Sequence, residues 1–537
     1  MDVLKKSIIT LICIITLQCA RTGFMLTGGA KDTIPPKAIS FSPKNFSKNV
    51  KDNVIRISFD ELIRIENVSK NVIISPPLKK MPKINPVSSP RDYISVELDV
   101  DSLKKNTTYI INFIKAIKDN NESNLLPELK YVFSTGDNID SLTVKGTVQY
   151  SNKKDLPKDV TVMLYPIDEN YTDSILYKEL PTYMTNTRDS NYFEITNIKE
   201  GLYKLIALKS KSQQIKYSLK NDSIGFVVNT LKLPQDTSTF FKLNLFKELD
   251  TFDIQRPIHA SKGKIQLLFK GTPRDIDVKR ISPVKNDSIR DLFIRSFTGD
   301  TIDYWFEREE QDSITFEISR NKIPIDTVSV DLKRQKEQDF TINPNIKGTL
   351  HITEKLSFKT NKPIYAINDS CISIVDKDSI SIPLHLEINK LKDQVAILFD
   401  TQEKQEYKLE LLPGAIESIF KERNDTINTS FRTISKIDYG SIKITLNKIP
   451  EKNIIIELMD GNKVIRRASC KNGEKTYLFE YLQPKHYSFR IIVDDNDNDR
   501  WDTGNHVKNL LPEEIIYYKD SITVKSNWDI EEKWDLF

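Results

Sequence analysis

The chain has 537 residues, with 79 lysines and arginines, 75 aspartates and glutamates, and 39% hydrophobic residues. At roughly 100–150 residues per domain, this length predicts about four or five ordinary domains rather than a disordered chain. The formal charge of +4 comes with both signs interspersed, so no basic stripe is present to bind nucleic acid. No GxGxxG or GxxxxGK[ST] motif occurs, which argues against the usual nucleotide-binding loops.

The first residues predict export from the cytoplasm. Lys5 and Lys6 precede an apolar run from Ile8 to Leu17, the pattern of a secretory signal that is too short to span a membrane stably. Cys19 follows this run directly, an arrangement that resembles a bacterial lipobox. We therefore predict a signal peptide at 1–18 and acylation of Cys19. Cleavage to a freely secreted form is the alternative.

Short segments of alternating hydrophobicity follow residue 35. They are rich in Ile, Val, Tyr, Phe and Thr, and clusters of Asn, Asp, Lys and Pro separate them; examples are 54–59, 93–98, 109–113 and 160–165. Alternation with a period of two, repeated about every ten residues, is typical of antiparallel strands in sandwiches or barrels. The sequence therefore predicts an all-β fold.

An internal repeat organises these strands. Residues 57–59 and 133–135 return at an offset near 298, and the later segment 198–205 returns at an offset near 284. A repeat of this length indicates duplicated structural units. We interpret the chain as two copies of a two-domain unit with a further β-domain between them.

Several motifs resemble known domain families. Residues 32–36, 57–61, 74–77, 103–109 and 131–136 resemble the bacterial Ig-like domain of the S-layer type. The linker at 28–32 is similar to that of Bacteroidetes outer-membrane lipoproteins that carry this domain. Residues 142–226 resemble the carboxypeptidase-regulatory, or collagen-adhesin B-type, β-sandwich, which implies a rigid spacer.

These features predict a tandem arrangement of Ig-like and carboxypeptidase-regulatory-like β-sandwiches. Its divisions are a signal peptide (1–18), a lipidated linker (19–35), a bacterial Ig-like domain (36–137), a regulatory-like β-sandwich (138–246), a further β-sandwich (247–345), a second Ig-like domain (346–435) and a second regulatory-like β-sandwich (436–537).

One acidic segment has the spacing of a calcium loop. Asp495, Asp497 and Asp499 occupy positions 1, 3 and 5 of such a loop, where alternate carboxylates converge on a hard cation. Arg500 replaces the usual glycine and His506 the usual glutamate, so Asp502 or a backbone carbonyl would complete the shell. The alternative is an Asx-rich turn that binds nothing. In the first copy the aligned residues 210–218 lack the carboxylates.

Nothing in the sequence predicts catalysis. The five histidines are scattered and match no HExxH spacing, and no GxSxG motif occurs. Cys371 and Cys470 lie 99 residues apart in sequence and are interpreted as small buried hydrophobic residues rather than a disulfide or a reactive pair. We therefore expect no enzyme, no catalytic residues and no cofactor beyond possible calcium.

The resemblance implies a lipid-anchored protein of the outer membrane. Its expected role is that of a structural or interaction subunit of an outer-membrane or surface protein assembly, with protein partners, the membrane as anchor and no nucleic acid. A glycan-binding or adhesive surface lipoprotein is the alternative. The chain has only 4 Trp, which favours protein partners over glycans. In the lipoproteins that this chain resembles, acidic residues just after the cysteine signal export to the surface. Residues 20–27 contain none, so the surface and the periplasmic face of the membrane both stay open.

Overall fold

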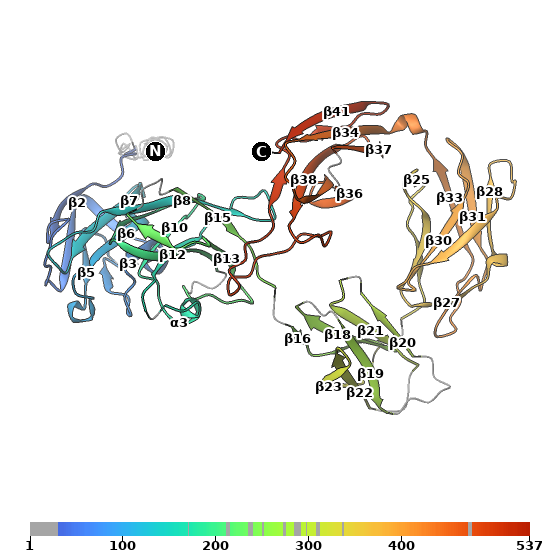
Figure 1. Ribbon diagram of the computed structural model, residues 1–537, viewed down its shortest axis with the longest axis horizontal. Helices are drawn as coiled ribbons and strands as arrows, with labels where there is room; N and C mark the ends of the chain where they lie inside the picture. Colours follow the sequence, from blue (N-terminus) through green and yellow to red (C-terminus); the bar gives the residue numbers. More distant parts are fainter. Residues whose placement is uncertain are drawn as a thin grey trace, which may run out of the picture.

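The computed structural model describes residues 31–536 except 88, 170, 211–214, 235–239, 250–251, 272–274, 284–290, 297, 308–311, 334, 336–337 and 471–474. Over these residues the chain is built almost entirely of strands (Figure 1). The predicted all-β, tandem sandwich architecture is confirmed. The predicted acylation site, Cys19, lies outside the described residues.

The N-terminal sandwich shows why the alternating pattern forms strands. In β2, Ile55, Ile57 and Phe59 are buried while the residues between them face outward, because successive side chains of a strand point to opposite faces. The sheet order is β3-β6-β2-β5-β4, with β1 on β2 and β7 on β6. The elements are β1 (Ala38–Ser42), β2 (Val54–Ile65), α2 (Val68–Asn71), β3 (Val72–Ser75), β4 (Lys83–Asn85), β5 (Arg91–Glu97), η1 (Val100–Ser102), β6 (Thr108–Asp119) and β7 (Leu125–Ser134).

The second sandwich packs a sheet β11-β8-β15 against a sheet β10-β9-β12-β13, with β14 on β12. Strands β9 and β12 are buried on both faces. One face contributes to the core between the two sheets, and the other lies under a second apolar cluster that includes Leu176 of α3 and Tyr217. The elements are β8 (Leu142–Tyr150), β9 (Thr161–Pro166), α3 (Ile175–Lys178), β10 (Tyr183–Asn186), β11 (Tyr192–Ile198), β12 (Gly201–Lys209), β13 (Ser223–Phe226), β14 (Leu231–Leu233) and β15 (Phe240–Leu245).

The third sandwich has a sheet β16-β18-β21-β20, with β17 on β18, and a sheet β19-β22-β23. Its core gathers aromatic side chains such as Tyr304, Phe306 and Phe316. The elements are β16 (Asp253–Ile254), β17 (Ile258–Ser261), β18 (Lys264–Lys270), β19 (Ile276–Ser282), β20 (Leu292–Arg295), β21 (Thr301–Trp305), β22 (Ser313–Arg320) and β23 (Ile323–Asp331).

The fourth sandwich has sheets β24-β26-β30-β29 and β25-β33-β31-β28, with β27 paired to β32. β24 pairs with β26, so this sheet begins before residue 346, where the second Ig-like domain was expected to start. The elements are β24 (Ile342–Pro344), β25 (Thr349–Leu350), β26 (Leu356–Thr360), β27 (Ile364–Ile367), η2 (Asp369–Cys371), β28 (Ile372–Asp376), β29 (Leu384–Ile388), β30 (Gln394–Phe399), β31 (Glu406–Leu411), β32 (Ile416–Ser418) and β33 (Ile427–Thr433).

The C-terminal sandwich repeats the strand order of the second. Its sheets are β37-β34-β41 and β36-β35-β38-β39, with β40 on β38. The last strand runs parallel to the first in both sandwiches, as β15 to β8 and as β41 to β34. The elements are η3 (Lys436–Asp438), β34 (Gly440–Asn447), β35 (Asn453–Asp460), β36 (Lys463–Cys470), β37 (Thr476–Leu482), β38 (His486–Asp494), β39 (Ile515–Tyr517), β40 (Ile522–Thr523) and β41 (Asp529–Asp535).

The path of the chain brings the C-terminal sandwich back to the second sandwich. Figure 1 shows the third and fourth sandwiches leading away from the second, and the C-terminal sandwich returning beside it. Hydrogen bonds join the two: Thr503 donates through Oγ1 to the carbonyl of Lys247 at 2.7 Å, and Lys154 donates through Nζ to the carbonyl of Tyr518 at 2.9 Å. The five-domain division itself stays a prediction.

Gly146 in β8 offers a test of the second sandwich. A Cβ at this position would lie 1.9 Å from the carbonyl oxygen of Phe241 in β15, so alanine forces the two strands apart. We expect Gly146→Ala to lower the free energy of unfolding of this sandwich by about 1–3 kcal/mol. Hydrogen exchange would show faster amide exchange in β8 and β15. The control, Thr147→Ala, is a half-buried neighbour in the same strand, and equal effects of the two variants would contradict the explanation.

Candidate functional site

The acidic loop after β38 is held together by two buried carboxylates. Asp494 is 2% exposed and accepts backbone N–H groups from Asn498 at 3.1 Å and Asp499 at 2.8 Å. Glu513 is 6% exposed and accepts the N–H groups of Asp495 at 2.9 Å and Asp502 at 2.8 Å. These bonds satisfy backbone donors that the loop would otherwise leave unpaired.

The predicted calcium ligands contact different groups. Asp495 pairs with Lys452 at 2.6 Å, and Asp497 accepts a hydrogen bond from the side chain of Asn453 at 2.6 Å. Asp502 accepts from Asn496 and Asn498 and forms an ion pair with Arg500. Asp499, the fourth, donates its backbone N–H to Asp494. In the described part of the chain, no three His, Cys, Asp or Glu side chains gather as a metal site would require. Calcium binding by these residues stays a prediction.

The same loop docks on the second sandwich, which the sequence did not indicate. Glu248 is 3% exposed and accepts two hydrogen bonds, one from the Tyr217 hydroxyl at 2.5 Å and one from the backbone N–H of His506. Gly504 packs so closely that a Cβ there would lie 2.6 Å from Cζ of Phe246. We call the contact of loop residues 503–509 with the second sandwich the seam. It joins residues more than 250 positions apart.

His506 is buried in the seam without a hydrogen bond to its ring. It is 2% exposed, its ring meets that of Phe226 edge-on with centroids 5.4 Å apart, and neither ring nitrogen has a partner among the described residues. The charged groups that face it are Asp173, Glu248 and Lys204. Burial lowers the pKa of His506 below its ordinary value, although the two carboxylates oppose this effect.

Lys204 of β12 is a second buried basic group of the seam. It is 6% exposed and donates through Nζ to the carbonyl of Val228 at 3.0 Å and to Oδ1 of Asn509 at 3.1 Å. Burial lowers its pKa as well. Two basic groups, His506 and Lys204, are therefore buried in the seam near the carboxylates of Asp173 and Glu248. Burial disfavours the charged form of each base.

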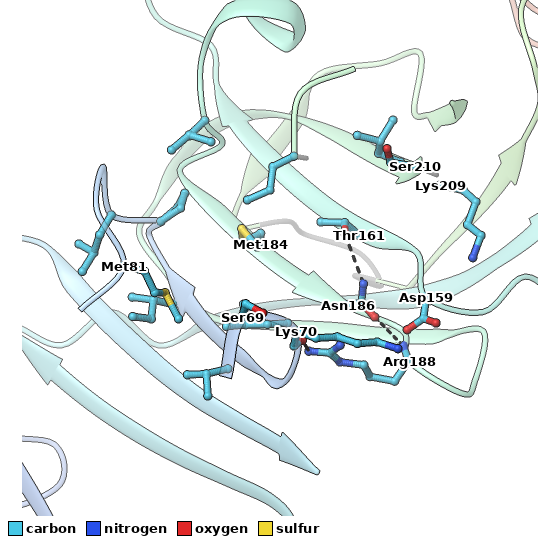
Figure 2. A pocket seen from close by; sticks show the side chains of 18 residues that line it. Ser69, Lys70, Met81, Asp159, Thr161, Met184, Asn186, Arg188, Lys209 and Ser210 are labelled. Carbon is cyan, nitrogen blue, oxygen red and sulfur yellow. Dashed lines mark hydrogen bonds between the residues drawn. The ribbon is translucent and has the colours of Figure 1, made fainter. Parts of the chain in front are cut away.

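A cleft of about 410 Å³ lies at the junction of the first and second sandwiches (Figure 2). Three contacts set this junction. Ser75 accepts the backbone N–H of Met184 at 3.0 Å, Arg188 donates to the carbonyl of Lys70, and Lys115 pairs with Asp189. The residues that line the cleft come from α2, β3 and the segment after it on one side, and from β9, β10 and the end of β12 on the other.

The lining of the cleft is divided by polarity. Figure 2 shows Met81 at one side and Asp159, Arg188 and Lys209 at the other. Apolar side chains dominate the first part: Val72, Ile73, Ile74, Pro77, Leu78, Met81, Leu180, Met184, Leu208 and Ile215. Polar side chains form the second: Ser69, Lys70, Asp159, Thr161, Asn186, Arg188, Lys209 and Ser210. An apolar cleft with a few convergent polar groups is typical of ligand-binding sites.

Three cations and one carboxylate line the polar end. Arg188 donates to the Lys70 carbonyl, and Lys209 donates to the carbonyl of Lys158. Within the described residues, neither of these side chains nor that of Lys70 forms an ion pair, and Nε of Arg188 is buried without a partner. Burial lowers the pKa of Arg188, against the influence of Asp159 and Asp189. Among the described lining residues, cations thus outnumber carboxylates at this end of the cleft by three to one.

Sequence reasoning missed both the cleft and the seam. One available signal was the long excursion of the first copy around residues 171–187. Its helix α3 contributes Leu176 to the apolar cluster on the outer face of β9 and β12, and its end forms the edge strand β10. Cys371 is a free, half-buried cysteine, so it is less buried than expected. The side chain of Cys470 lies outside the described residues.

Comparison with known families identifies one part of the chain. Residues 32–135 match the family model of the bacterial Ig-like domain, so the resemblance for the first predicted domain is confirmed. No curated protein matches.

Similar solved structures cover much of the chain at low identity. The surface layer protein SbsC, domains 1–6, is 10% identical, with 91% of this chain and 67% of that chain covered and a TM-score of 0.16. BcpA, the major pilin subunit of Bacillus cereus, is 10% identical, with 74% and 99% covered and a TM-score of 0.14. The structure of native alpha-2-macroglobulin from Escherichia coli that spans domains MG0-NIE-MG1 is 11% identical, with 56% and 97% covered and a TM-score of 0.13. These TM-scores are too low to support an argument about function.

The buried histidine predicts that acid weakens the seam. Burial lowers the pKa of His506 in the docked state below its ordinary value of 6.5. The docked state therefore keeps its full stability above this ordinary value. It loses stability as the pH falls below it, because the undocked histidine takes up a proton more readily. We expect small-angle scattering to show a larger radius of gyration at about pH 5.5 than at about pH 7.5. His506→Phe keeps an aromatic ring that cannot titrate and is expected to reduce this change.

The matched control is His385→Phe, an exposed histidine in β29 of the fourth sandwich, which should leave the pH response intact. Equal expansion of the wild-type protein and the His506→Phe variant would show that other groups govern the seam.

Proposed function

We propose that this protein is a non-enzymatic structural subunit of a cell-envelope assembly, anchored to the outer membrane through acylated Cys19. The observation that carries the proposal is the seam. It holds two sandwiches far apart in sequence in one fixed arrangement, as a scaffold for partner proteins requires.

The chemistry of the seam supports a fixed geometry. Glu248 is a buried carboxylate, and its hydrogen bonds come from Tyr217 on its own sandwich and from His506 on the other. A buried carboxylate that loses such partners is strongly destabilising. A shift of the C-terminal sandwich would remove the hydrogen bond from His506 and leave Glu248 with the Tyr217 hydroxyl, so the seam resists sliding.

The histidines support a role without catalysis. Nδ1 of His351 contacts the Tyr439 hydroxyl at 3.1 Å, and Nδ1 of His486 contacts the Thr523 hydroxyl at 2.9 Å. His506 is enclosed by the seam. These three histidines thus lie in structural contacts, where burial or a local hydroxyl accounts for each ring.

The tryptophans favour protein partners over glycans. Trp305 and Trp534 are both 6% exposed, and Trp501 donates through Nε1 to the Glu513 carbonyl at 2.9 Å. These three rings are committed to packing or to the acidic loop. Trp528 is 54% exposed, with Nζ of Lys525 4.6 Å from its ring centroid. It is the observation that favours the second candidate, a glycan-binding or adhesive lipoprotein, because an exposed ring offers a stacking platform.

Membrane attachment in this proposal rests on the lipid. Within the described residues, no helix has the length and apolar character to cross a membrane. Each buried methylene of an acyl chain contributes about 0.8 kcal/mol, and two or more chains anchor a protein stably. A diacylated or triacylated Cys19 supplies that anchor.

A pull-down of the full-length protein from membranes in mild detergent tests the proposal. With a tag after residue 537, we expect the wild-type protein to fractionate with outer membranes and to recover envelope proteins in stoichiometric amounts, identified by mass spectrometry. Cys19→Ala removes the acylation site, so it should release the protein from membranes and lose these partners. Cys371→Ala, which removes a free cysteine of the fourth sandwich, serves as the matched control and should behave as wild type.

Two outcomes would contradict the proposal. Membrane association that survives Cys19→Ala would remove the lipid anchor from it. Recovery of the protein without any partner would remove the assembly role. A glycan-array screen comparing wild type with Trp528→Ala would then test the second candidate.

A further inference from the structure

The cleft between the first two sandwiches has the dimensions of a ligand site. Its volume of about 410 Å³ falls in the range of about 300–1,000 Å³ that is typical of small-molecule pockets. It opens between two rigid sandwiches, and both walls contribute to its lining. A site of this kind belongs to the junction, and neither sandwich forms it alone.

The apolar part of the cleft fits a flexible hydrocarbon. Apart from one proline, its side chains are aliphatic or thioether groups, among them Leu78, Met81, Leu180 and Met184. Such a wall gains free energy from burying methylene groups but offers few side-chain partners to the backbone N–H and C=O groups of a peptide, which must be satisfied when buried. The lining therefore favours an alkyl chain over a peptide.

The polar end of the cleft fits an anion. Lys70, Arg188 and Lys209 outnumber the single carboxylate, Asp159. Arg188 donates across the junction to the Lys70 carbonyl, which holds its guanidinium beside the Lys70 side chain at this end. A carboxylate group placed here would accept charge-assisted hydrogen bonds, which are stronger than neutral ones.

From these two ends we infer that the cleft binds a free fatty acid, with its alkyl chain along the apolar wall and its carboxylate toward Arg188 and Lys70. The inference goes beyond the proposed envelope role and does not rest on it.

Calorimetric titration of laurate into the full chain tests the inference. The Cys19→Ala form avoids detergent and acyl chains of the anchor, and laurate is used below its micelle concentration. We expect saturable binding of one laurate per chain, confirmed by native mass spectrometry. Dodecyltrimethylammonium, which has the same chain length and a cationic head, should bind at least about tenfold more weakly because it meets like charge. Acetate, which lacks the chain, should not bind measurably.

Variants assign the binding to the cleft. Lys70→Gln removes one cation whose side chain makes no described hydrogen bond or ion pair, and it should weaken laurate binding by about fivefold. Leu180→Glu and Met81→Glu replace half-exposed residues of the apolar wall, 38% and 43% exposed, and should each weaken binding by at least about tenfold. Lys232→Gln and Leu202→Glu, exposed residues outside the cleft, are the matched controls and should bind as wild type.

Several results would overturn the inference. These are the absence of saturable laurate binding, equal affinity for the cationic and anionic amphiphiles, or equal effects of the cleft variants and their controls. Circular dichroism of each variant checks that it folds. If one apolar variant misfolds, the other together with Lys70→Gln still decides the question.

Discussion

The carboxylate of Glu248 is the contact on which the arrangement of the sandwiches depends. It is 3% exposed and accepts hydrogen bonds from the second sandwich, through Tyr217, and from the C-terminal sandwich, through the backbone of His506. Removing a carboxylate from water is unfavourable unless hydrogen bonds replace the lost hydration. The requirement to satisfy this one group therefore fixes where the loop after β38 meets the second sandwich.

The second sandwich contacts both the first and the C-terminal sandwich. The sheet that contains β9 and β12 packs on both faces, with the sandwich core on one and a second apolar cluster on the other. One apolar cluster on the outer face of β9 and β12 contains Leu208, which lines the cleft, and Phe226 and Phe246, which meet the seam. The cleft toward the first sandwich and the seam toward the last are thus packed on the same group of side chains. Close packing transmits small displacements. A ligand in the cleft would therefore contact the same apolar cluster that the docked loop contacts.

The acidic loop shows how burial changes the role of a sequence pattern. The spacing of Asp495, Asp497 and Asp499 drew attention to this loop, but the carboxylates that hold it are Asp494 and Glu513, which flank the predicted ligands and are nearly inaccessible. The spacing of charges is visible in sequence. The packing of the loop decides which carboxylates are buried against backbone N–H donors. The spacing of residues in the sequence does not predict this.

The all-β class, the duplication of units and the bacterial Ig-like domain over residues 32–135 could be predicted from the sequence. The all-β class follows from the alternation of side chains along each strand, which is a local property. The duplication follows from segments that recur along the chain, and the Ig-like domain from its motifs. The burial of His506 in the seam and the meeting of Lys70 and Arg188 at one cleft emerge only from the packing of the sandwiches against each other. Such contacts join surfaces of different sandwiches, and their free energy depends on shape and burial that adjacent residues do not encode.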